Sequence, residues 1–428
     1  MEVTRRNFLG ASATAVIAAG TMTKGKVFGA NDKVAFCCIG IHGQGASHIK
    51  DLLETEGAEV VALCDVDKDV LEQRGKDVEK KTGKKPKLYS DPRDVMADKK
   101  IDAITIATPN HWHSLLTIWG CEAGKDVYVE KPLSHNIFEG RQVVKAAEKY
   151  GRIVQHGTQG RSNARWIRDI QLMHDGFIGK INMAKGFTYK NGNRNSIGFA
   201  SPEAPPKNLD WNLWQGPAQE QPYCKNYVHY NWHWFWIYGN GETGNQGVHQ
   251  MDLAVWGLGR NTLPVRTYSS GGRFAWDDQA ETPNTQTSVM TYEDGAVLVF
   301  EVRNLGSYDE AGKETGNHFF GDKGYYVEGQ GFFDYKHNPI PVEQPEPPGK
   351  SKWENFLTAV RSRKQEDIRG NALDGHLSAA HCHIANAPYR LKRSLNFDPK
   401  TEKFIGDDEA NTLITRKYRE PFVVSEIA

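Results

Sequence analysis

Residues 33–65 read KVAFCCIGIHGQGASHIKDLLETEGAEVVALCD. The apolar run 33–39 is too short for a helix and precedes a glycine-rich loop, so it predicts a buried parallel strand. Residues 46–56 predict a helix, and residues 59–64 predict a second buried strand that ends at Asp65. A strand, a glycine loop, a helix and a strand in this order predict a βαβ unit of a parallel sheet.

The same alternation continues to residue 156, and the pattern then changes. Helices are predicted at 68–81, 114–123 and 138–150, and strands at 101–107, 126–129 and 152–155. After residue 156 we predict a hairpin at 285–303, a strand at 324–328 and helices at 353–363 and 375–393. The sequence therefore predicts an α/β fold, with a Rossmann parallel-sheet domain at 31–156. An α+β domain with a large, mainly antiparallel sheet follows at 157–428.

The overall composition limits the classes of partner. Lys plus Arg and Asp plus Glu both number 53, so the net charge is zero and long-range attraction to nucleic acid is not expected. The six cysteines form no C-x-x-C pair, which argues against a zinc ribbon. His381 and His383 are two apart on a predicted helix and would point to different sides. No metal site is therefore predicted.

The first thirty residues have the composition of a targeting segment. Basic and polar residues Thr4-Arg5-Arg6-Asn7-Phe8-Leu9 precede a short, Ala-rich apolar stretch at 11–19. This pattern resembles a twin-arginine (Tat) export signal, which predicts a periplasmic or otherwise exported protein with a signal at 1–30. The apolar stretch is much shorter than the ~20 residues that span a bilayer, so no membrane anchor is expected. A disordered cytosolic tail remains the alternative.

The loop after the first strand has the composition of a dinucleotide-binding turn. It consists of Gly40, Ile41, His42, Gly43, Gln44 and Gly45. Gly40 and Gly45 fit the first and third glycines of the G-x-G-x-x-G pattern, while His42 replaces the second. The pyrophosphate would lie on the N-terminus of the following helix, and either His42 points away or the phosphate shifts toward Gly43.

Asp65 lies 20 residues after Gly45, at the end of the second strand. An acidic residue there binds the adenosine ribose hydroxyls and repels a 2′-phosphate, so NAD is favoured over NADP. Lys68 and Arg74 are near enough in the sequence to keep NADP open.

Two later stretches carry a family resemblance. Ala107-Thr108-Pro109-Asn110-His111-Trp112-His113 and Val129-Glu130-Lys131-Pro132 resemble the signature loops of the Gfo/Idh/MocA oxidoreductases. The resemblance implies that Lys131 holds or relays the proton of a substrate hydroxyl. It also implies that Glu130, Thr108, Asn110, His113, Gln159 and Trp214 line the cofactor. A lysine beside the positive nicotinamide of NAD⁺ should have a lowered pKa, which suits a general base.

A second family motif lies at Gly244-Asn245-Gln246-Gly247-Val248-His249. The resemblance assigns His249 a catalytic role, while Asn245 stands where the family usually has Asp. A spacing of four places both on one helical face. Since an amide cannot take a proton, acid–base work is expected from Lys131 and His249.

The segment 230–236, YNWHWFW, is rich in aromatic residues. Such residues can stack on sugars, so we predict substrate contacts at His229, Trp232, His233 and, after the first domain, Arg161. Hydrophobic core is the alternative reading of the aromatic residues.

These observations lead to three functional hypotheses. The first is an NAD(P)-dependent oxidoreductase that oxidises a hydroxyl of a sugar, glycoside or polyol with a tightly held cofactor. The second is a redox-neutral, NAD-dependent glycoside hydrolase that acts through a transient 3-keto intermediate. The third is a non-catalytic sugar or dinucleotide sensor. The resemblance also implies a homo-oligomer, paired through the sheet of the second domain.

Overall fold

The computed structural model describes residues 32–190, 196–305, 309–347, 349 and 351–428. The predicted export signal at 1–30 lies outside the described residues.

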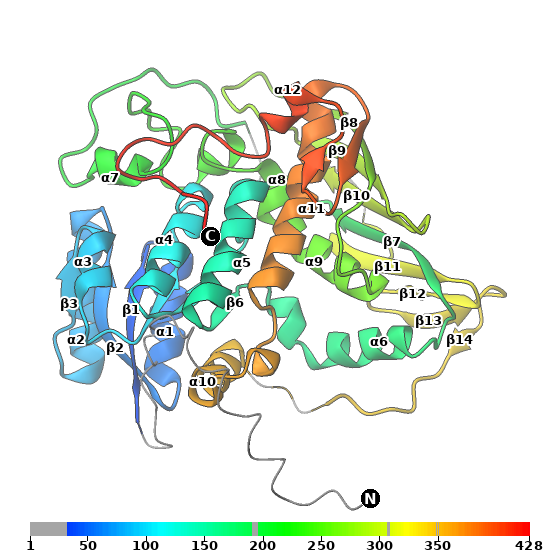
Figure 1. Ribbon diagram of the computed structural model, residues 1–428, viewed down its shortest axis with the longest axis horizontal. Helices are drawn as coiled ribbons and strands as arrows, with labels where there is room; N and C mark the ends of the chain where they lie inside the picture. Colours follow the sequence, from blue (N-terminus) through cyan, green and yellow to red (C-terminus); the bar gives the residue numbers. More distant parts are fainter. Residues whose placement is uncertain (1–31, 191–195, 306–308, 348, 350) are drawn as a thin grey trace, which may run out of the picture.

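The N-terminal part forms a six-stranded parallel sheet (Figure 1). Its strands are β1 (Val34–Ile39), β2 (Ala58–Cys64), β3 (Lys87–Tyr89), β4 (Ala103–Ile106), β5 (Asp126–Val129) and β6 (Val154–His156). Their order, β3-β2-β1-β4-β5-β6, is that of a dinucleotide-binding Rossmann sheet, in which the strand order reverses beside β1. The predicted parallel sheet is confirmed, with the short edge strand β3 in addition.

Helices cover both faces of this sheet. One face is covered by α1 (Gln44–Glu54), α2 (Lys68–Thr82) and α10 (Lys352–Ser362), and the other by α3 (Pro92–Ala97), α4 (Asn110–Glu122) and α5 (Ile137–Tyr150). Both faces are apolar, since β1 directs Phe36 and Cys38 to one cluster and Cys37 and Ile39 to the other. This two-sided burial explains why the strands read as continuous apolar runs.

The second sheet has ten strands, mostly antiparallel, with β7 and β10 as its parallel pair. The strands are β7 (Ile181–Thr188), β8 (Arg266–Gly272), β9 (Thr285–Thr291), β10 (Val297–Arg303), β11 (Thr315–Gly321), β12 (Gly324–Val327), β13 (Gly331–Asp334), β14 (Pro339–Ile340), β15 (Leu395–Asp398) and β16 (Lys403–Phe404). The predicted mainly antiparallel sheet and the hairpin of β9 and β10 are confirmed.

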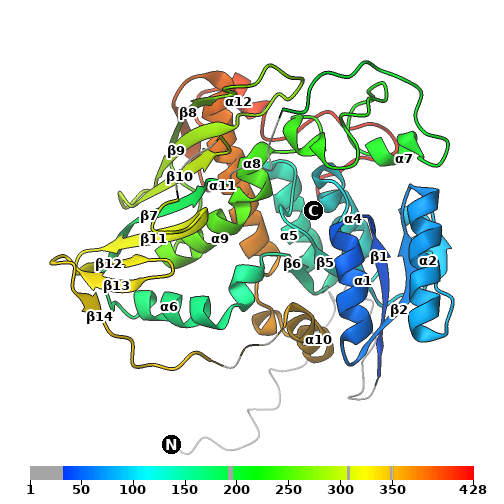
Figure 2. The same ribbon diagram turned by 180° about the vertical axis from the view of Figure 1, so that it is seen from behind.

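The remaining helices belong to the second part of the chain. They are α6 (Ala164–His174), α7 (Trp211–Gln215), α8 (Gly241–Asn245), α9 (Gly247–Leu258), α11 (Ala372–Leu391) and α12 (Asp408–Asn411), with 3₁₀ turns at Gln159–Ser162, Asn231–Trp234 and Gln365–Asp367. Figures 1 and 2 show α11 running between the Rossmann part and the second sheet. Together with α9, it packs on one face of that sheet, while Tyr268 and Thr287 on the opposite face are exposed.

Two segments of the predicted second domain pack on the first. Trp353 and Phe356 of α10 contact the ring of Phe36 in β1, with ring centroids 6.3 and 5.9 Å apart. At the C-terminus, Phe422 and Ile427 join the core under α4 and α5. Among the described residues no helix is both long and apolar enough to cross a bilayer.

One predicted helix start is wrong in a way that affects the site. Helix α4 begins at Asn110, not at Ser114, because Pro109 has a φ of −59° and can directly precede the first turn. Asn110 and His113 therefore lie in the first turn of a helix, directly after strand β4.

Candidate functional site

A pocket of about 990 Å³ lies along the carboxyl ends of β1, β2, β4 and β5. A crevice at this edge, where the strand order reverses, is where open α/β sheets bind ligands. The pocket brings together most of the predicted residues: Gly40, His42, Gly43, Gln44, Asp65, Thr108, Asn110, His113, Glu130, Lys131, Gln159, Trp214, His229, Trp232, His233, Asn245 and His249. Ile41, Gly45 and Arg161 are not among its lining residues.

The glycine loop is packed against the end of β1 and against the segment after β4. Gly40 has a φ of +76°, and a Cβ there would lie 2.7 Å from the backbone nitrogen of Thr108. A Cβ on Gly45 would lie 1.8 Å from the carbonyl oxygen of Gly40. Both positions therefore require glycine, as a tight turn and a close helix–strand contact demand.

The start of α1 suits the pyrophosphate of NAD. Its N-cap, Gly43, offers no side-chain hydrogen bond to the amides of the first turn, and a Cβ on Gly43 would meet no atom within 4 Å. Free amides at a helix N-terminus favour an anion, and the open space at Gly43 lets one approach. The buried hydroxyl of Thr108, which has no hydrogen-bond partner, gives a further polar group in the same crevice. These residues fit the cofactor.

Asp65 supports the loop as well as the pocket. Its Oδ2 accepts a hydrogen bond from the backbone nitrogen of Ile41 at 2.8 Å, and its Oδ1 accepts one from that of Asp67 at 3.0 Å. Burial raises the pKa of this carboxyl, and the two backbone hydrogen bonds act in the opposite direction. Each oxygen accepts one of these two bonds, so lone pairs remain for ribose hydroxyls.

His42, the departure from the glycine pattern, is exposed and stacks on His229, with ring centroids 4.4 Å apart. The imidazole of His42 therefore lies against the part of the pocket wall that His229 forms. His229 was expected to contact substrate. Its Nε2 lies 3.6 Å from Oδ2 of Asp67, and Asp65 also acts on it electrostatically. The structure thus places His229 beside Asp65, at the end of the pocket predicted to hold adenosine.

The opposite end of the pocket is more enclosed. The ring of His113 lies between two carbonyl oxygens, with Nδ1 2.7 Å from Pro132 O and Nε2 2.7 Å from Thr108 O. The amide of Asn110 donates to Oδ1 of Asn240 at 3.1 Å. These contacts fix the first turn of α4 against the loops after β4 and β5.

Glu130 is buried and remains ionised. Its Oε1 lies 3.0 Å from His48 Nε2 and accepts a hydrogen bond from Gln44 Nε2 at 3.3 Å. Burial alone would raise the pKa of Glu130, but the hydrogen bond and charge of His48, with the charge of Lys131, lower it to about 2. A lowered pKa favours the negatively charged form of Glu130 next to Lys131 near neutral pH.

Lys131 is held by the second family motif. Its Nζ donates to the backbone oxygen and to Oδ1 of Asn245, both at 3.2 Å. The amide nitrogen of Asn245 in turn donates to the hydroxyl of Tyr230 and to Oε2 of Glu242, both at 3.3 Å. Asn245 thus orients the lysine amine with its acceptor and anchors itself with its donors.

The predicted single helix through Asn245 and His249 is interrupted. Helix α8 ends at Asn245 and α9 begins at Gly247, although Gln246 keeps helical angles of −78° and −38°. Both side chains still line the pocket. Burial, with the charges of Lys131 and Lys190, lowers the pKa of His249 to about 3. Its imidazole is therefore neutral near pH 7, and the catalytic role of His249 stays a prediction.

Four further residues line the pocket and were not predicted as site residues from the sequence: Tyr230, Lys190, Gln246 and Lys352. Lys190 donates to Oε1 of Gln246, and the Tyr230 ring is half exposed above Asn245. For Tyr230 the signal was present in the aromatic segment. Lys190 follows β7, a strand that was not predicted.

The aromatic residues of segment 230–236 pack with those near Trp214 and Tyr238. Together they form hydrophobic core and part of the pocket wall. Trp232, Trp214, Phe235 and Tyr238 belong to one buried cluster, and Trp211 stacks on Trp214 at 4.7 Å. The ring of His233 stacks on Trp232 at 3.5 Å, and both line the pocket. The core reading therefore holds for most of these rings, with Trp214, Trp232 and His233 also facing the pocket.

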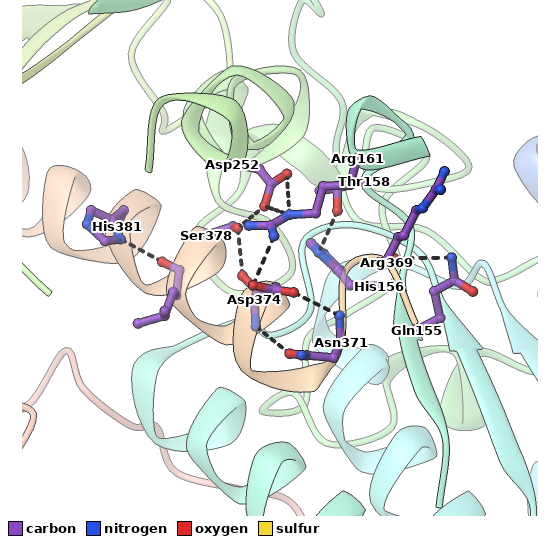
Figure 3. Close-up of polar contacts among 11 residues, drawn as sticks. Gln155, His156, Thr158, Arg161, Asp252, Arg369, Asn371, Asp374, Ser378 and His381 are labelled. Atoms are coloured by element: carbon purple, nitrogen blue, oxygen red, sulfur yellow. Dashed lines mark hydrogen bonds and ion pairs between the residues drawn. The ribbon is translucent and has the colours of Figure 1, made fainter. Parts of the chain in front are cut away.

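Arg161 was expected to contact substrate, but it lies outside the pocket. Its Nε lies 2.9 Å from Oδ1 of Asp252, and its Nη1 lies 2.9 Å from Oδ1 of Asp374 (Figure 3). Ser378 donates to the same oxygen of Asp252 at 2.6 Å. Because two carboxylates hold the guanidinium, Arg161 ties the chain after β6 to α9 and α11.

His381 and His383 turn to different partners. The Nε2 of His381 lies 2.7 Å from the hydroxyl of Tyr292, and the Nε2 of His383 lies 3.3 Å from that of Ser134. No group of three or more His, Cys, Asp or Glu side chains suited to a metal occurs within the part of the chain that the structure describes.

Comparison with known proteins gives one family over both parts. Residues 33–158 match the Gfo/Idh/MocA model described as "Oxidoreductase family, NAD-binding Rossmann fold". Residues 166–424, more than half of the chain, match "Oxidoreductase family, C-terminal alpha/beta domain".

Curated relatives share a low sequence identity with this chain. A "Glycosyl hydrolase family 109 protein" from Shewanella pealeana is 28% identical over 208 residues, which cover 42% of this chain and 45% of that protein. The chain thus matches less than half the length of this relative.

Two solved structures share the fold. The WlbA dehydrogenase of Bordetella pertussis, in complex with NADH and UDP-GlcNAcA, has a TM-score of 0.62 and 20% identity, covering 86% of this chain and 99% of its own. The scyllo-inositol dehydrogenase of Lactobacillus casei, with NAD(H) and scyllo-inositol, has a TM-score of 0.60 and 16% identity, covering 85% and 99%. With its two matching parts, the chain belongs to the Gfo/Idh/MocA oxidoreductase family.

Proposed function

We propose that this protein is an NAD-dependent oxidoreductase that oxidises a hydroxyl group of a sugar, glycoside or polyol. One observation carries the proposal: Lys131, held by Asn245, shares a single pocket with the glycine loop and Asp65. The pocket therefore combines groups suited to a dinucleotide with an amine suited to a substrate proton.

The chain's residues divide into two tasks. The amides at the start of α1 would hold the pyrophosphate, Asp65 the adenosine ribose, and Asn110, His113 and Glu130 the nicotinamide end. When bound, the nicotinamide accepts two electrons and the carbon-bound hydrogen of the alcohol.

Lys131 moves the proton in this proposal. Its Nζ, as the neutral amine, accepts the proton of the substrate hydroxyl, and Asn245 keeps the amine directed at that oxygen. His249 stays neutral and orients the substrate by hydrogen bonding. The face of Trp232 and the hydroxyl of Tyr230 complete the walls that meet the sugar.

A glycoside hydrolase is the second candidate, and the relative from Shewanella pealeana favours it. In this reaction the same pocket would oxidise the sugar transiently at C3, which acidifies the hydrogen on C2. The glycosidic bond would then break by elimination, water would add, and the ketone would be reduced again. Lys131 would serve both oxidation and reduction, so no net NADH would form.

A single assay separates these readings. Purified protein is incubated with a panel of sugars, polyols and aryl glycosides, with and without added NAD⁺, while NADH and free aglycone are measured. NADH formation supports the oxidoreductase, and aglycone release without net NADH supports the hydrolase. If neither product forms while NAD binds, the enzyme proposal fails and the sensor reading is favoured. Lys131→Met tests the site, and Lys80→Met, at an exposed lysine in the last turn of α2, is the matched control.

We also propose that the protein is exported through the Tat route, on the strength of Arg5-Arg6 and the apolar stretch after them. An exported enzyme lacks a ready supply of NAD⁺, which supports a tightly held cofactor. A fusion of residues 1–31 to a folded reporter should reach the periplasm, and the Arg5→Lys/Arg6→Lys variant should not. A reporter retained in the cytoplasm in both cases would contradict export.

We further propose a homo-oligomer, paired through the exposed face of the ten-stranded sheet that carries Tyr268 and Thr287. Light scattering on the purified protein tests it, and a monomer at micromolar concentration would contradict it.

A further inference from the structure

A second cavity, of about 330 Å³, lies apart from the cofactor pocket and shares none of its lining residues. Its walls come from the segment after Lys131, from α11, from the loop before α8, and from the C-terminal tail 412–417. Figure 1 shows this tail, in red, crossing above α5 after α12. The volume is at the lower end of the range for small-molecule sites.

The charged residues that line this cavity are all cationic. Arg390, Arg416 and Lys417 line it, and no Asp or Glu is among the residues that line it. Arg416 is partly balanced by Glu139, whose Oε1 lies 2.8 Å from its Nε. Arg390 and Lys417 form no ion pair with any residue that the structure describes, although the charge of the nearby Glu281 acts on Arg390. Such a cavity favours an anion.

Arg390 also has an aromatic neighbour. Its guanidinium carbon lies 4.9 Å from the ring centroid of Trp236, which lines the same cavity. The nearby Glu281 accepts a hydrogen bond from the backbone nitrogen of Trp236 and does not line the cavity. Stacking on the ring leaves the guanidinium edge able to donate to a ligand.

Three residues that line this cavity have buried polar atoms without a hydrogen bond. Both ring nitrogens of His135 are buried and lack a hydrogen bond, as does Oδ1 of Asn386, a residue only 4% exposed. Buried polar groups are rarely left unpaired. The Nη1 of Arg416 is a further buried donor without a hydrogen bond. Together they offer donors to an oxyanion and acceptors to hydroxyl groups.

The protonation state of His135 determines which hydrogen bonds it can offer to a ligand. Burial, with the charge of Arg416 and the neighbouring His383, holds the pKa of His135 well below its usual range. A neutral imidazole has one N–H donor and one lone pair. It can therefore bind an anionic oxygen on one side and accept a hydroxyl hydrogen on the other.

We propose that this cavity is a binding site for a hydroxylated oxyanion of monosaccharide size, such as a phosphorylated or carboxylated sugar. Arg390, Arg416 and Lys417 bind the anionic group, and His135 and Asn386 bind the hydroxyls. The site is separate from the cofactor pocket: Asn240 stands between them, with its Nδ2 donating to His135 O and its Oδ1 accepting from Asn110. This proposal does not depend on the proposed oxidoreductase activity.

Calorimetry on NAD-saturated protein tests the site, because NAD covers the other anion-binding position at α1. The titrants are glucose 6-phosphate, glucuronate and inorganic phosphate, with glucose as the uncharged match. We expect at least one sugar anion to bind, and the Arg390→Gln/Lys417→Gln variant to bind it at least about tenfold more weakly. Lys76→Gln/Lys80→Gln, which removes two exposed charges from α2, should bind like the wild type.

A second measurement locates the ligand. The imidazole signal of His135, assigned with His135→Gln, should shift when the wild type is titrated and should not shift in the double variant. Equal binding by the wild type and the double variant would overturn the proposal, as would the absence of binding by any of the three anions. Stronger binding of glucuronate than of glucose 6-phosphate would assign the carboxylate class, and the reverse order the phosphate class.

Discussion

Lys131 and Asn245 lie 114 positions apart in the chain, yet the lysine Nζ donates to both oxygens of Asn245 at 3.2 Å. The first residue follows the fifth Rossmann strand, and the second ends helix α8. This contact joins the two halves of the molecule at the point where chemistry is proposed. It also restricts the amine to one direction, which is the condition for proton transfer at a fixed atom.

Replacing Lys131 by Met should remove turnover while preserving the cofactor site. The variant keeps most of the side-chain volume and loses the amine, so we expect kcat to fall by ~10²–10⁴, the usual contribution of a general base. NAD affinity, measured by quenching of tryptophan fluorescence, should change little. Turnover within about twofold of the wild type would contradict the role of Lys131.

Asn245→Asp should shift the pH–rate profile. A carboxylate at this position favours the charged form of Lys131, so the acidic limb should move to higher pH by about one unit or more. Asn245→Ala is the matched control, which loses the hydrogen bond without adding charge and should lower kcat without that shift. An identical profile for both variants would show that charge next to Lys131 does not govern the rate.

Asp65→Asn should relax the choice of cofactor. The amide oxygen can still accept from the backbone nitrogen of Ile41, while the bond from Asp67 and the charge that repels a 2′-phosphate are lost. The ratio of NADP to NAD affinity should rise by about tenfold or more, which corresponds to about 1.4 kcal/mol. Asp69→Asn, on the exposed first turn of α2, should leave the ratio unchanged. An unchanged ratio in Asp65→Asn as well would remove Asp65 from the adenosine site.

His381 should make stability depend on pH. Burial lowers its pKa from 6.5 to about 4, so the unfolded chain binds a proton more readily than the folded protein. Stability from this group is therefore complete above about pH 6.5 and is lost as the pH falls toward 4. Relative to His381→Gln, the wild type should lose about 2 kcal/mol between about pH 7 and pH 5 in urea unfolding. A pH-independent difference between the two proteins would be inconsistent with a depressed pKa.

The part of the site that could be predicted is the part encoded locally. Gly40, Gly45 and Asp65 lie within a single strand–loop–helix–strand unit, so their spacing alone determined their positions. The parallel sheet followed from continuous apolar runs, and the β9–β10 hairpin from the turn residues Glu293-Asp294-Gly295 between its strands.

The contacts that could not be predicted join distant segments. From the sequence, Arg161 was expected to bind a ligand. Its ion-pair partners Asp252, in α9, and Asp374, in α11, are far from it in the chain, so these contacts could not be predicted. His229 lies at the Asp65 end, where its ring stacks on His42 and its Nε2 lies 3.6 Å from Asp67. The return of α10 to the Rossmann sheet depends on Trp353 and Phe356 packing on Phe36, which a local pattern does not contain.

The position of the nicotinamide ring tests the central claim most directly. A crystal structure of the protein with NAD should show the pyrophosphate on the amides of α1 and the ring C4 within about 5 Å of Lys131 Nζ, so that one substrate carbon and its oxygen reach both. A dinucleotide bound elsewhere, or a ring separated from Lys131 by the side chains of His42 and His229, would contradict it.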